Sequence, residues 1–484
     1  MSRIVIDPLN RQNGVTRVEV ELAGGRVVEA RITNPNLKGF ELLLLGRDPN
    51  DAPFFSERIC GICSSVHAMA ASLALEDAYG ASPPHNGLLL RNLILGADLL
   101  QNHIRHFYLL SLPDWAPLPD RPPLTPRYRL SEQRFTAAEV ERLTRNYERG
   151  IVAGQQAHAL VVVFGTRAPH QQAMLAGGVA TRPRAELVAQ ATALLADLRR
   201  FIAEALVPDT ELLASRHAEY FDLGRSQGNL LSYGMFPRPG ADGERYYPPG
   251  VLLGGQREKL DPSQIAEDLT NAWYRNPTGE PQPPLKGRTD PADDLSRGYS
   301  FTKAPRYRGE PMEGGPLARA WLRGDYRRGL GAMDRILARS YEARQVAEWM
   351  NEWLHDLKVE EPAYEPPKVV RKGTGVGLHD AFRGPLGHWL KIRGGRLVHY
   401  QIITPSAWEL SPRDGRGVRG PAEQALIGTE IADPENPVEI GRILRSFDPC
   451  SACSVQLLEL DGRAFPPVAG PAGALRKAGG GEKA

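Results

Sequence analysis

The sequence predicts a mainly helical α+β fold, one large domain built on a central helical bundle with peripheral β-hairpins. Long stretches with apolar residues at helical spacing fill the middle of the chain. Two shorter stretches, residues 16–32 and 389–403, alternate apolar and polar residues around a Gly-Gly pair, as β-hairpins do. A length of 484 residues would allow two or three domains, but no linker divides the chain, so one domain is expected.

The helices are expected in the following order. The first, residues 66–79, ends before Pro83-Pro84, and the second, 88–112, is apolar nearly all round, which places it inside the bundle. Further helices are predicted at residues 136–163, 184–206, 316–357, 421–428 and 437–446. Residues 237–315 are rich in Pro and Gly, which indicates long surface loops with short strands.

Composition and charge exclude several classes of partner. A net charge of +2, from 59 basic and 57 acidic residues, gives no reason to expect nucleic acid or an anionic membrane. No run approaches the roughly 20 apolar residues that span a bilayer, so direct membrane insertion is not expected. The first residues lack the apolar core of a signal peptide. We therefore expect a cytoplasmic chain, or one that is exported or membrane-associated together with a partner that carries the signal.

The four cysteines form two pairs, Cys60-Gly61-Ile62-Cys63 near the start and Cys450-Ser451-Ala452-Cys453 near the end. A chain with no other cysteine and two CxxC pairs predicts a metal site. Thiolates suit zinc, iron–sulfur clusters, copper(I) or nickel. Zinc ribbons place their pairs within a few tens of residues, which argues against zinc here. The spacing alone leaves a structural zinc site or redox dithiols open.

The residues around each pair carry a resemblance to a known family. Residues 58–67 follow the pattern R-x-C-G-x-C-x-x-x-H, and residues 448–453 read D-P-C-x-x-C. With these motifs the chain resembles the large, catalytic subunit of nickel–iron hydrogenases over nearly its whole length. Further matching stretches lie at residues 46–49, 51–53, 103–108, 303–307, 315–319, 383–389 and 411–414. The resemblance implies the fold of that subunit for residues 1–456.

The resemblance also implies a metal centre. Cys60, Cys63, Cys450 and Cys453 would bind nickel, and the second cysteine of each pair would bridge to an iron that carries CO and cyanide. At this centre H2 would be cleaved heterolytically or formed. The proton would go to a terminal thiolate, Cys60 or Cys450, or to Arg383.

Three residues are expected to line or support that centre. By the resemblance, Pro405 and Ser406 would surround the diatomic ligands of the iron, with Ser406 donating a hydrogen bond to a cyanide. His67 lies one helical turn after Cys63, from where it can donate a hydrogen bond to the Cys63 sulfur. A magnesium ion is also implied, with Glu41, the backbone carbonyl of Ile402 and Gln456 as ligands. Such oxygen ligands are those that magnesium prefers.

The partners follow from the same resemblance. The chain has no spare cysteines to conduct electrons, so an iron–sulfur small subunit is required. Its substrates would be H2 and protons, and maturation factors would load the metals.

Three departures from the family are expected to matter. Asn13 replaces the glutamate that usually carries protons away from the terminal nickel cysteine, and an amide has no proton to release near pH 7. Phe382 stands before Arg383 where a proline is usual. Family precursors are trimmed after a histidine or arginine three residues past the last cysteine, but here that residue is Gln456. Residues 457–484 are therefore a tail that maturation either removes or leaves in place.

Two alternatives remain beside a catalytic hydrogenase subunit. Asn13 favours a hydrogen-sensing regulatory relative with an intact metal site and low turnover. A non-catalytic relative of the respiratory complex I subunit is the other, although such relatives generally lack the nickel cysteines.

Overall fold

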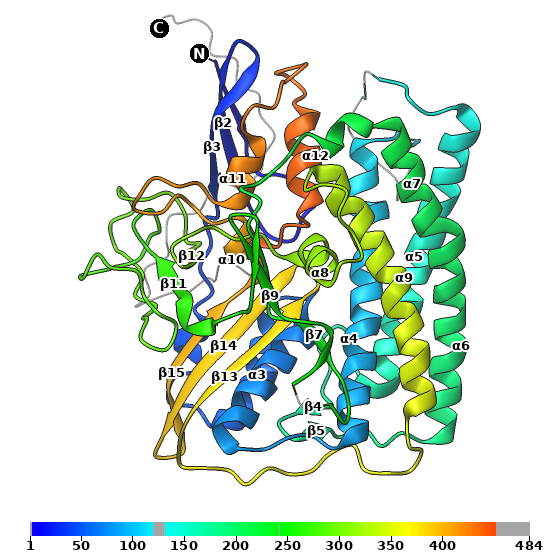
Figure 1. Ribbon diagram of the computed structural model, residues 1–484, viewed down its shortest axis with the longest axis vertical. Coiled ribbons are helices and arrows are strands. Elements are labelled where there is room, and N and C mark those ends of the chain that lie inside the picture. Colours follow the sequence, from blue (N-terminus) through cyan, green and yellow to red (C-terminus); the bar gives the residue numbers. More distant parts are fainter. Residues whose placement is uncertain (1, 120–129, 131, 242, 452–484) are drawn as a thin grey trace, which may run out of the picture.

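The computed structural model describes residues 2–119, 130, 132–241 and 243–451. A bundle of long helices stands beside a second layer in which helix α3 (Ser64–Tyr79) covers the sheet of β13, β14 and β15 (Figure 1). The helix-rich α+β fold predicted from the sequence is confirmed. In the described part of the chain, no helix is both long and apolar enough to cross a membrane.

The bundle is built around α4. Helix α4 packs against α5 and α9, and α6 packs against the same two helices. Its residues are buried on nearly every side, which confirms the interior position predicted for 88–112. A π-helical segment, His106–Ser111, extends it. The bundle helices are α4 (His85–Arg105), α5 (Ala137–Gly165), α6 (Ala185–Phe201), α7 (Val207–Arg216) and α9 (Ala332–Asp356).

The single helix predicted for residues 316–357 is wrong, because two helices occupy this range. Helix α8 (Gly315–Arg323) ends at Gly324, whose φ of 101° is a left-handed conformation that favours glycine. Helix α9 begins after Gly331, where an added Cβ would lie 2.3 Å from the carbonyl oxygen of Phe221. The glycines therefore allow the chain to turn where the apolar periodicity continues.

The second predicted hairpin belongs to a three-stranded antiparallel sheet. Strand β14 (Gly384–Arg393) lies between β13 (Lys372–Ala381) and β15 (Arg396–Ile403). The sheet is not peripheral, because α3 packs on it and β14 is buried along most of its length. Cβ atoms at Gly375 and Gly377 would lie within 2 Å of backbone oxygens of α3, so only glycine permits this close packing.

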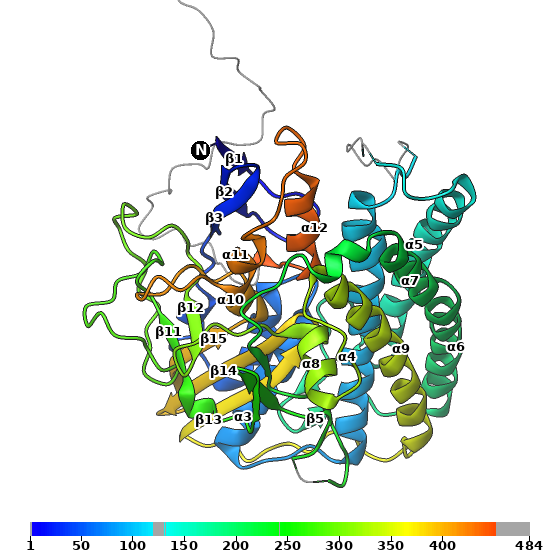
Figure 2. The ribbon, with the colours of Figure 1, turned by 45° about the horizontal axis from the view of Figure 1, so that its top comes forward.

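The first predicted hairpin is confirmed and gains a third strand. Strands β2 (Arg17–Ala23) and β3 (Arg26–Thr33) turn at Gly24-Gly25, and β1 (Ser2–Ile6) pairs with β2. This sheet projects from one end of the molecule (Figure 2). The amide of Val27 donates to the carbonyl of Thr429, which joins the N-terminal sheet to the C-terminal segment.

The remaining elements are short. The described residues of 237–314 form short strands, connecting loops and one 3-10 turn, Pro262–Gln264, which agrees with the predicted loops and short strands. The short strands are β4 (Met174–Leu175), β5 (Gly178–Val179), β6 (Leu230–Ser232), β7 (Met235–Pro237), β8 (Arg245–Tyr247), β9 (Gly250–Leu253), β10 (Gln256–Glu258), β11 (Ile265–Asp268) and β12 (Ala304–Tyr307). The short helices are α1 (Phe40–Leu43), α2 (Ala52–Ser56), α10 (Pro405–Glu409), α11 (Pro421–Leu426) and α12 (Val438–Ser446).

Candidate metal centre

Three cysteine thiols meet in the core of the molecule. The Sγ atoms of Cys60, Cys63 and Cys450 all lie within 4.8 Å of one another, and those of Cys60 and Cys450 are 3.6 Å apart. All three side chains are buried. Cys453 and Gln456 lie outside the described residues. The fold thus brings the two ends of the chain together at one cluster of soft ligands.

The first pair is held by the start of α3. Cys60 is extended and follows a short 3-10 turn, Glu57–Ile59, while Cys63 immediately precedes α3. The amide of Ile62 donates a hydrogen bond to the Cys60 sulfur over 3.3 Å. Because the amides and dipole of a helix N-terminus favour negative charge, this end of α3 stabilises thiolates.

The second pair is placed by the chain after α12. Asp448 has a φ of 57°, a left-handed conformation that bends the chain toward the cluster. The amide of Cys450 donates a hydrogen bond to the Ser406 Oγ atom over 3.0 Å. Pro405 and Ser406 begin α10 and are buried. Since the Ser406 oxygen accepts this bond, its own hydroxyl proton is left to be donated, which is the role predicted for it.

Arg383 lies in the two-residue turn between β13 and β14. Its Nε atom donates to the Asp448 carbonyl over 2.7 Å, and Nη2 donates to Asn102 Oδ1 over 2.8 Å and to Asp448 Oδ1 over 3.1 Å. Asn102 also donates to Asp448 Oδ2 over 2.8 Å. The Nη1 atom is buried without a hydrogen-bond partner in the described part of the chain. Phe382 beside it is fully buried in the core.

Charge pairing sets the ionisation of these residues. Burial lowers the pKa of Arg383, but Asp448 and the three thiolates outweigh it and hold that pKa well above its usual value. Burial raises the pKa of Asp448, but Arg383 and other positive neighbours lower it to about 2. Arg383 is therefore a fixed cation paired with Asp448.

Asn13 lies directly against two of the sulfur atoms. Its Nδ2 atom is 3.2 Å from both Cys60 Sγ and Cys450 Sγ, so one amide donates to both thiols. The Asn13 backbone pairs with that of Cys450, and its carbonyl accepts a hydrogen bond from Ser451 Oγ over 3.2 Å. Asn13 is thus a neutral donor at the position where the resemblance implied a glutamate.

A histidine pair supports the start of α3. The Nδ1 atom of His67 lies 3.2 Å from Nε2 of His388, whose Nδ1 contacts the Tyr400 hydroxyl over 2.9 Å. Burial lowers the pKa of His67 to about 4, so its ring is neutral at pH 7. The bond from His67 to the Cys63 sulfur stays a prediction.

Glu41 lies in a separate, oxygen-rich cluster. Its Oε1 atom accepts from the Ile402 amide over 2.8 Å, which sets the two predicted magnesium ligands side by side. The ammonium of Lys303 lies 3.4 Å from Glu41 Oε2 and 3.5 Å from Glu267 Oε2. Thr289 donates to the same Glu41 oxygen. Lys303 therefore already provides a positive charge where magnesium is expected.

Sequence reasoning missed three residues of these clusters. Asp98 and Asn102 lie on α4, buried, and Lys303 faces Glu41. Asp98 is the one acidic residue in the stretch 88–112, which was predicted to lie inside the bundle, and this was a signal because buried charges are rare unless they are paired. Lys303 offered no such signal, since its partner is far away in sequence.

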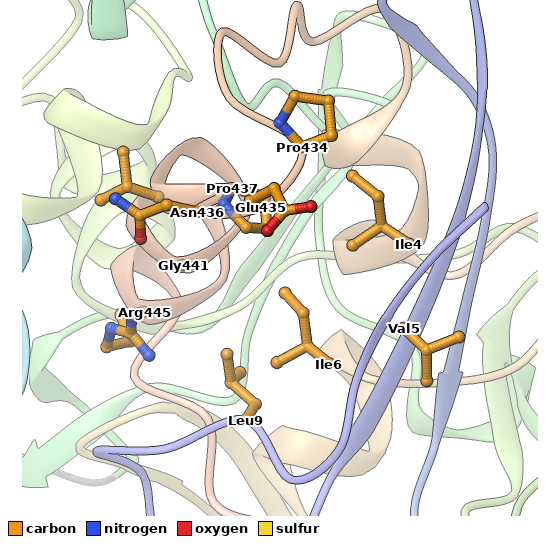
Figure 3. Close-up of a pocket in the computed structure, with 11 residues that line it drawn as sticks. Ile4, Val5, Ile6, Leu9, Pro434, Glu435, Asn436, Pro437, Gly441 and Arg445 are labelled. Atoms are coloured by element: carbon orange, nitrogen blue, oxygen red, sulfur yellow. The ribbon is translucent and has the colours of Figure 1, made fainter. Parts of the chain in front are cut away.

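A pocket of about 250 Å³ lies between β1 and α12 (Figure 3). Its lining includes none of the predicted site residues. Arg445, at one side of the pocket, donates to the Asn10 carbonyl over 2.8 Å and pairs with Asp114, which also binds Arg11. This network anchors the segment that carries Asn13.

The donor set fits a thiolate-bound metal. Three buried thiols converge, and they raise the pKa of Arg383, whose Nη1 atom has no hydrogen-bond partner within the described ranges. Buried negative charge of this kind requires a compensating cation, and soft divalent metals bind such ligands most strongly.

Comparison with known proteins gives the same assignment. The profile of the family described as nickel-dependent hydrogenase matches residues 38–120, 120–330 and 326–456. The periplasmic [NiFeSe] hydrogenase large subunit of Desulfomicrobium baculatum is 34% identical over 493 residues, with 95% of this chain and 96% of the relative covered. The hydrogenase-1 large chain of Escherichia coli K12 is 31% identical, with the same coverage.

Solved structures agree with the sequence relatives. The Ni-Fe-Se hydrogenase from Desulfovibrio vulgaris Hildenborough in its reduced state superposes with a TM-score of 0.91 at 35% identity. The match covers 94% of this chain and 99% of the other. The fold and the cysteine cluster define a metal-dependent oxidoreductase. This chain belongs to the nickel-dependent hydrogenases, as a large subunit that acts on H2 with a small subunit as partner.

Proposed function

We propose that the chain cleaves or forms H2 heterolytically at a Ni–Fe centre bound by Cys60, Cys63, Cys450 and Cys453, with CO and cyanide on the iron. The observation that carries this proposal is the convergence of three buried thiols whose charges act on Arg383, a buried side chain whose Nη1 atom has no hydrogen-bond partner among the described residues. When bound, the metals supply Lewis acidity and accept the electrons of H2. Cys63 and Cys453 would bridge the two metals.

The side chains around the centre handle the proton and the charge. Cys60 and Cys450 are the proposed proton acceptors, because Arg383 keeps its own proton. Arg383 stabilises negative charge as a fixed cation, in the way that preorganised donors act at other active sites. Asn13 donates a hydrogen bond to both terminal sulfurs and so holds them side by side.

Pro405, Ser406 and His67 orient the centre. The Ser406 oxygen is fixed by the Cys450 amide, so its hydroxyl proton is free to bond a cyanide ligand. The apolar ring of Pro405 would exclude water from the same side. The contact of His67 with His388 fixes the orientation of its ring near Cys63.

The magnesium ion implied by the resemblance is kept as a weaker proposal. Glu41 and the backbone of Ile402 lie side by side, as a shared site requires. The ion would share the Glu41 carboxylate with Lys303, and Gln456 would supply a third oxygen. We also propose that residues 1–456 form the mature domain and that residues 457–484 are removed during maturation.

Electrons pass to an iron–sulfur small subunit in this proposal, and maturation factors insert the metals. A hydrogen-sensing role with low turnover is the second candidate. It is favoured by Asn13, because a neutral amide between the two terminal sulfurs cannot release a proton.

The test is the metal content and infrared spectrum of the purified complex. One nickel per large subunit, with bands of metal-bound CO and cyanide, is the expected result. Absence of nickel or of those bands in active preparations contradicts the proposal. The magnesium content of the same samples tests the proposed ion at Glu41. The intact mass of the chain shows whether residues 457–484 have been removed. A turnover well below that of active relatives, with all bands present, favours the sensor.

A further inference from the structure

The turn that carries Arg383 is bonded by a second buried arginine. Arg319 lies on α8, and its side chain is buried at the end of β13. Its Nη1 atom donates to the Ala381 carbonyl over 3.0 Å, and its Nη2 atom donates to the Phe382 carbonyl over 3.0 Å. These two residues come directly before Arg383 in the chain. The backbone from which the Arg383 side chain extends is therefore tied to Arg319.

The remaining N–H groups of Arg319 bond two carboxylates. Its Nε and Nη2 atoms donate to the two oxygens of Glu342 on α9, over 2.7 and 2.8 Å, and Nη1 donates to Asp380 Oδ2 over 3.1 Å. All five N–H donors of the guanidinium are thus used, and three of them bond the consecutive residues 380–382. Because the guanidinium is planar and rigid, these bonds fix its orientation relative to the end of β13.

Each of the two carboxylates has further partners. The Nε2 atom of His103, on α4, lies 2.8 Å from Glu342 Oε2. Asp380 accepts hydrogen bonds from the Ser232 hydroxyl and from the backbone amide of the next residue, each over 2.8 Å. Burial raises the pKa of Glu342, but Arg319 and His103 lower it to about 2, so Glu342 stays charged at pH 7. The network therefore joins α4, α8 and α9 to the end of β13.

The start of α8 also packs directly against the β13–β14 turn. A Cβ atom added to Gly315 would lie 3.0 Å from the Arg383 carbonyl oxygen, and one added to Gly384 would lie 2.7 Å from the Gly315 nitrogen. Gly315 has a φ of 89°, which favours glycine. Arg319 follows Gly315 by four residues, so α8 contacts the turn with its backbone and bonds it with this side chain.

We propose that Arg319 is a positioning residue for the reaction with H2, because together with Glu342 it fixes the turn that places the Arg383 guanidinium. This inference rests on the proposed function. At its other end the Arg383 side chain is held by Asp448 and Asn102. Active sites need their reacting groups held within about 0.5 Å of the working position, and support at both ends of the side chain supplies this.

The first test measures H2 oxidation by the complete hydrogenase complex with Arg319→Lys. Lysine keeps the charge but loses the fork that bonds the two carbonyls and Glu342. Activity per bound nickel should fall by about 10–10²-fold, since a small misplacement of a group at the reaction centre has an effect of this size. The matched control is Arg91→Lys, a change at another buried arginine, which bonds both oxygens of Glu76 and the Leu175 carbonyl. Its activity per nickel should equal that of the parent.

A double variant separates positioning from a general loss of structure. If Arg319 acts through Arg383, adding Arg319→Lys to Arg383→Lys should cause no further fall in activity per nickel, because the group that it positions is already changed. A fall equal to the product of the two single falls contradicts the proposal, since it shows that the two residues act independently.

Amide hydrogen exchange, followed by mass spectrometry on the same complexes, gives a readout other than activity. The peptide that covers the β13–β14 turn should exchange faster in Arg319→Lys and in Glu342→Gln than in the parent, and at the parent rate in Arg91→Lys. If Arg319→Lys forms no complex, Glu342→Gln takes its place in every measurement.

The failure of this inference differs from the failure of the proposed function. Parent-like exchange in the turn of Arg319→Lys, or parent-like activity per nickel, overturns the positioning role. Absence of nickel and of metal-bound CO and cyanide bands from the parent complex instead overturns the proposed function.

Discussion

Two buried aspartates, Asp448 and Asp98, are linked by hydrogen bonds to the segments that carry the cysteines, and their pKa values are shifted in opposite directions. Asp448 is bonded to Arg383 and Asn102, and its pKa is lowered to about 2. Asp98 is bonded to a serine hydroxyl, and its pKa is raised to about 7. Both lose the solvation that stabilises a charged carboxylate, so burial alone does not separate them.

The difference lies in the partners. A guanidinium that forms an ion pair offsets the desolvation of a buried carboxylate, whereas a neutral hydroxyl offsets only part of that desolvation. The Asp448 region therefore holds fixed charges that position Arg383 over the thiols. The Asp98 region holds a carboxyl group whose pKa burial raises toward neutral pH.

Arg383→Lys tests the fixed-charge region and has the largest expected effect. Lysine keeps the positive charge but loses the planar fork that bonds Asn102 and Asp448 together. We expect H2 oxidation to fall by about 10²–10³-fold, with nickel content unchanged. The measurement is H2-dependent dye reduction, normalised to bound nickel.

The matched control for this change is Arg442→Lys, another buried arginine, which bonds Tyr220 and the Asp114 carbonyl away from the thiols. It should affect stability more than turnover. Activity of Arg383→Lys within twofold of the parent contradicts the role given to the guanidinium.

The pH dependence of stability is the second test, on complex prepared without nickel. The folded-state pKa of Asp98 is raised, so its contribution to the free energy of unfolding is complete below pH 4 and is lost as pH rises toward 7. The pKa of Asp448 is lowered, so its contribution is complete above pH 4 and is lost as pH falls toward 2. The free energy of unfolding of the parent should fall between pH 4 and 8 because Asp98 ionises. In Asp98→Asn that fall should be smaller by on the order of 3 kcal/mol.

Asp448→Asn is the counterpart of that variant. The fall in the free energy of unfolding between pH 4 and 2 should be smaller by about 2 kcal/mol in Asp448→Asn than in the parent. Urea denaturation at several pH values measures both. Parallel stability curves for the parent and Asp98→Asn would show that Asp98 titrates as an ordinary aspartate.

Asn13→Glu has the smallest expected effect and sharpens the comparison. It places a titratable carboxyl beside Cys60 and Cys450, and this carboxyl can accept a proton from either sulfur. Exchange of D2 with water should rise by about tenfold, within the range of general acid–base effects. Asn13→Gln keeps the amide and should show no such rise. If exchange in Asn13→Glu equals that of the parent, the amide does not limit proton transfer.

Much of the site was predictable from the sequence because its residue types are rare. The only cysteines of the chain form two pairs, and three of them meet as expected. Arg383 lies at the cluster, as the motif around it implied. The partners could not be predicted, since Asn102 and Asp448 reach Arg383 from segments far apart in sequence. Asn13 was recognised as a lost acid, but its contact with both sulfurs depends on how the N-terminal segment docks.

In the fold, too, some elements were predicted from the sequence and others were missed. Both hairpins were located by their alternation, whereas β13 was missed because Gly375 and Gly377 weaken its strand pattern. Glycine is required at these two positions because the backbone of α3 packs directly against them, which is a tertiary contact. The break between α8 and α9 was missed because apolar periodicity continues across it, although Gly324 and Gly331 marked it.

The close packing of α3 on β13 has a consequence for electron transfer. Where glycines let a helix backbone touch a strand, the helix has no room to shift, because the interior is close-packed. The loop that carries Cys60 and Cys63 is fixed at the start of that helix. A metal held by such ligands would change oxidation state with little change in bond lengths. The reorganisation energy would then be small, and electrons would enter and leave the site quickly.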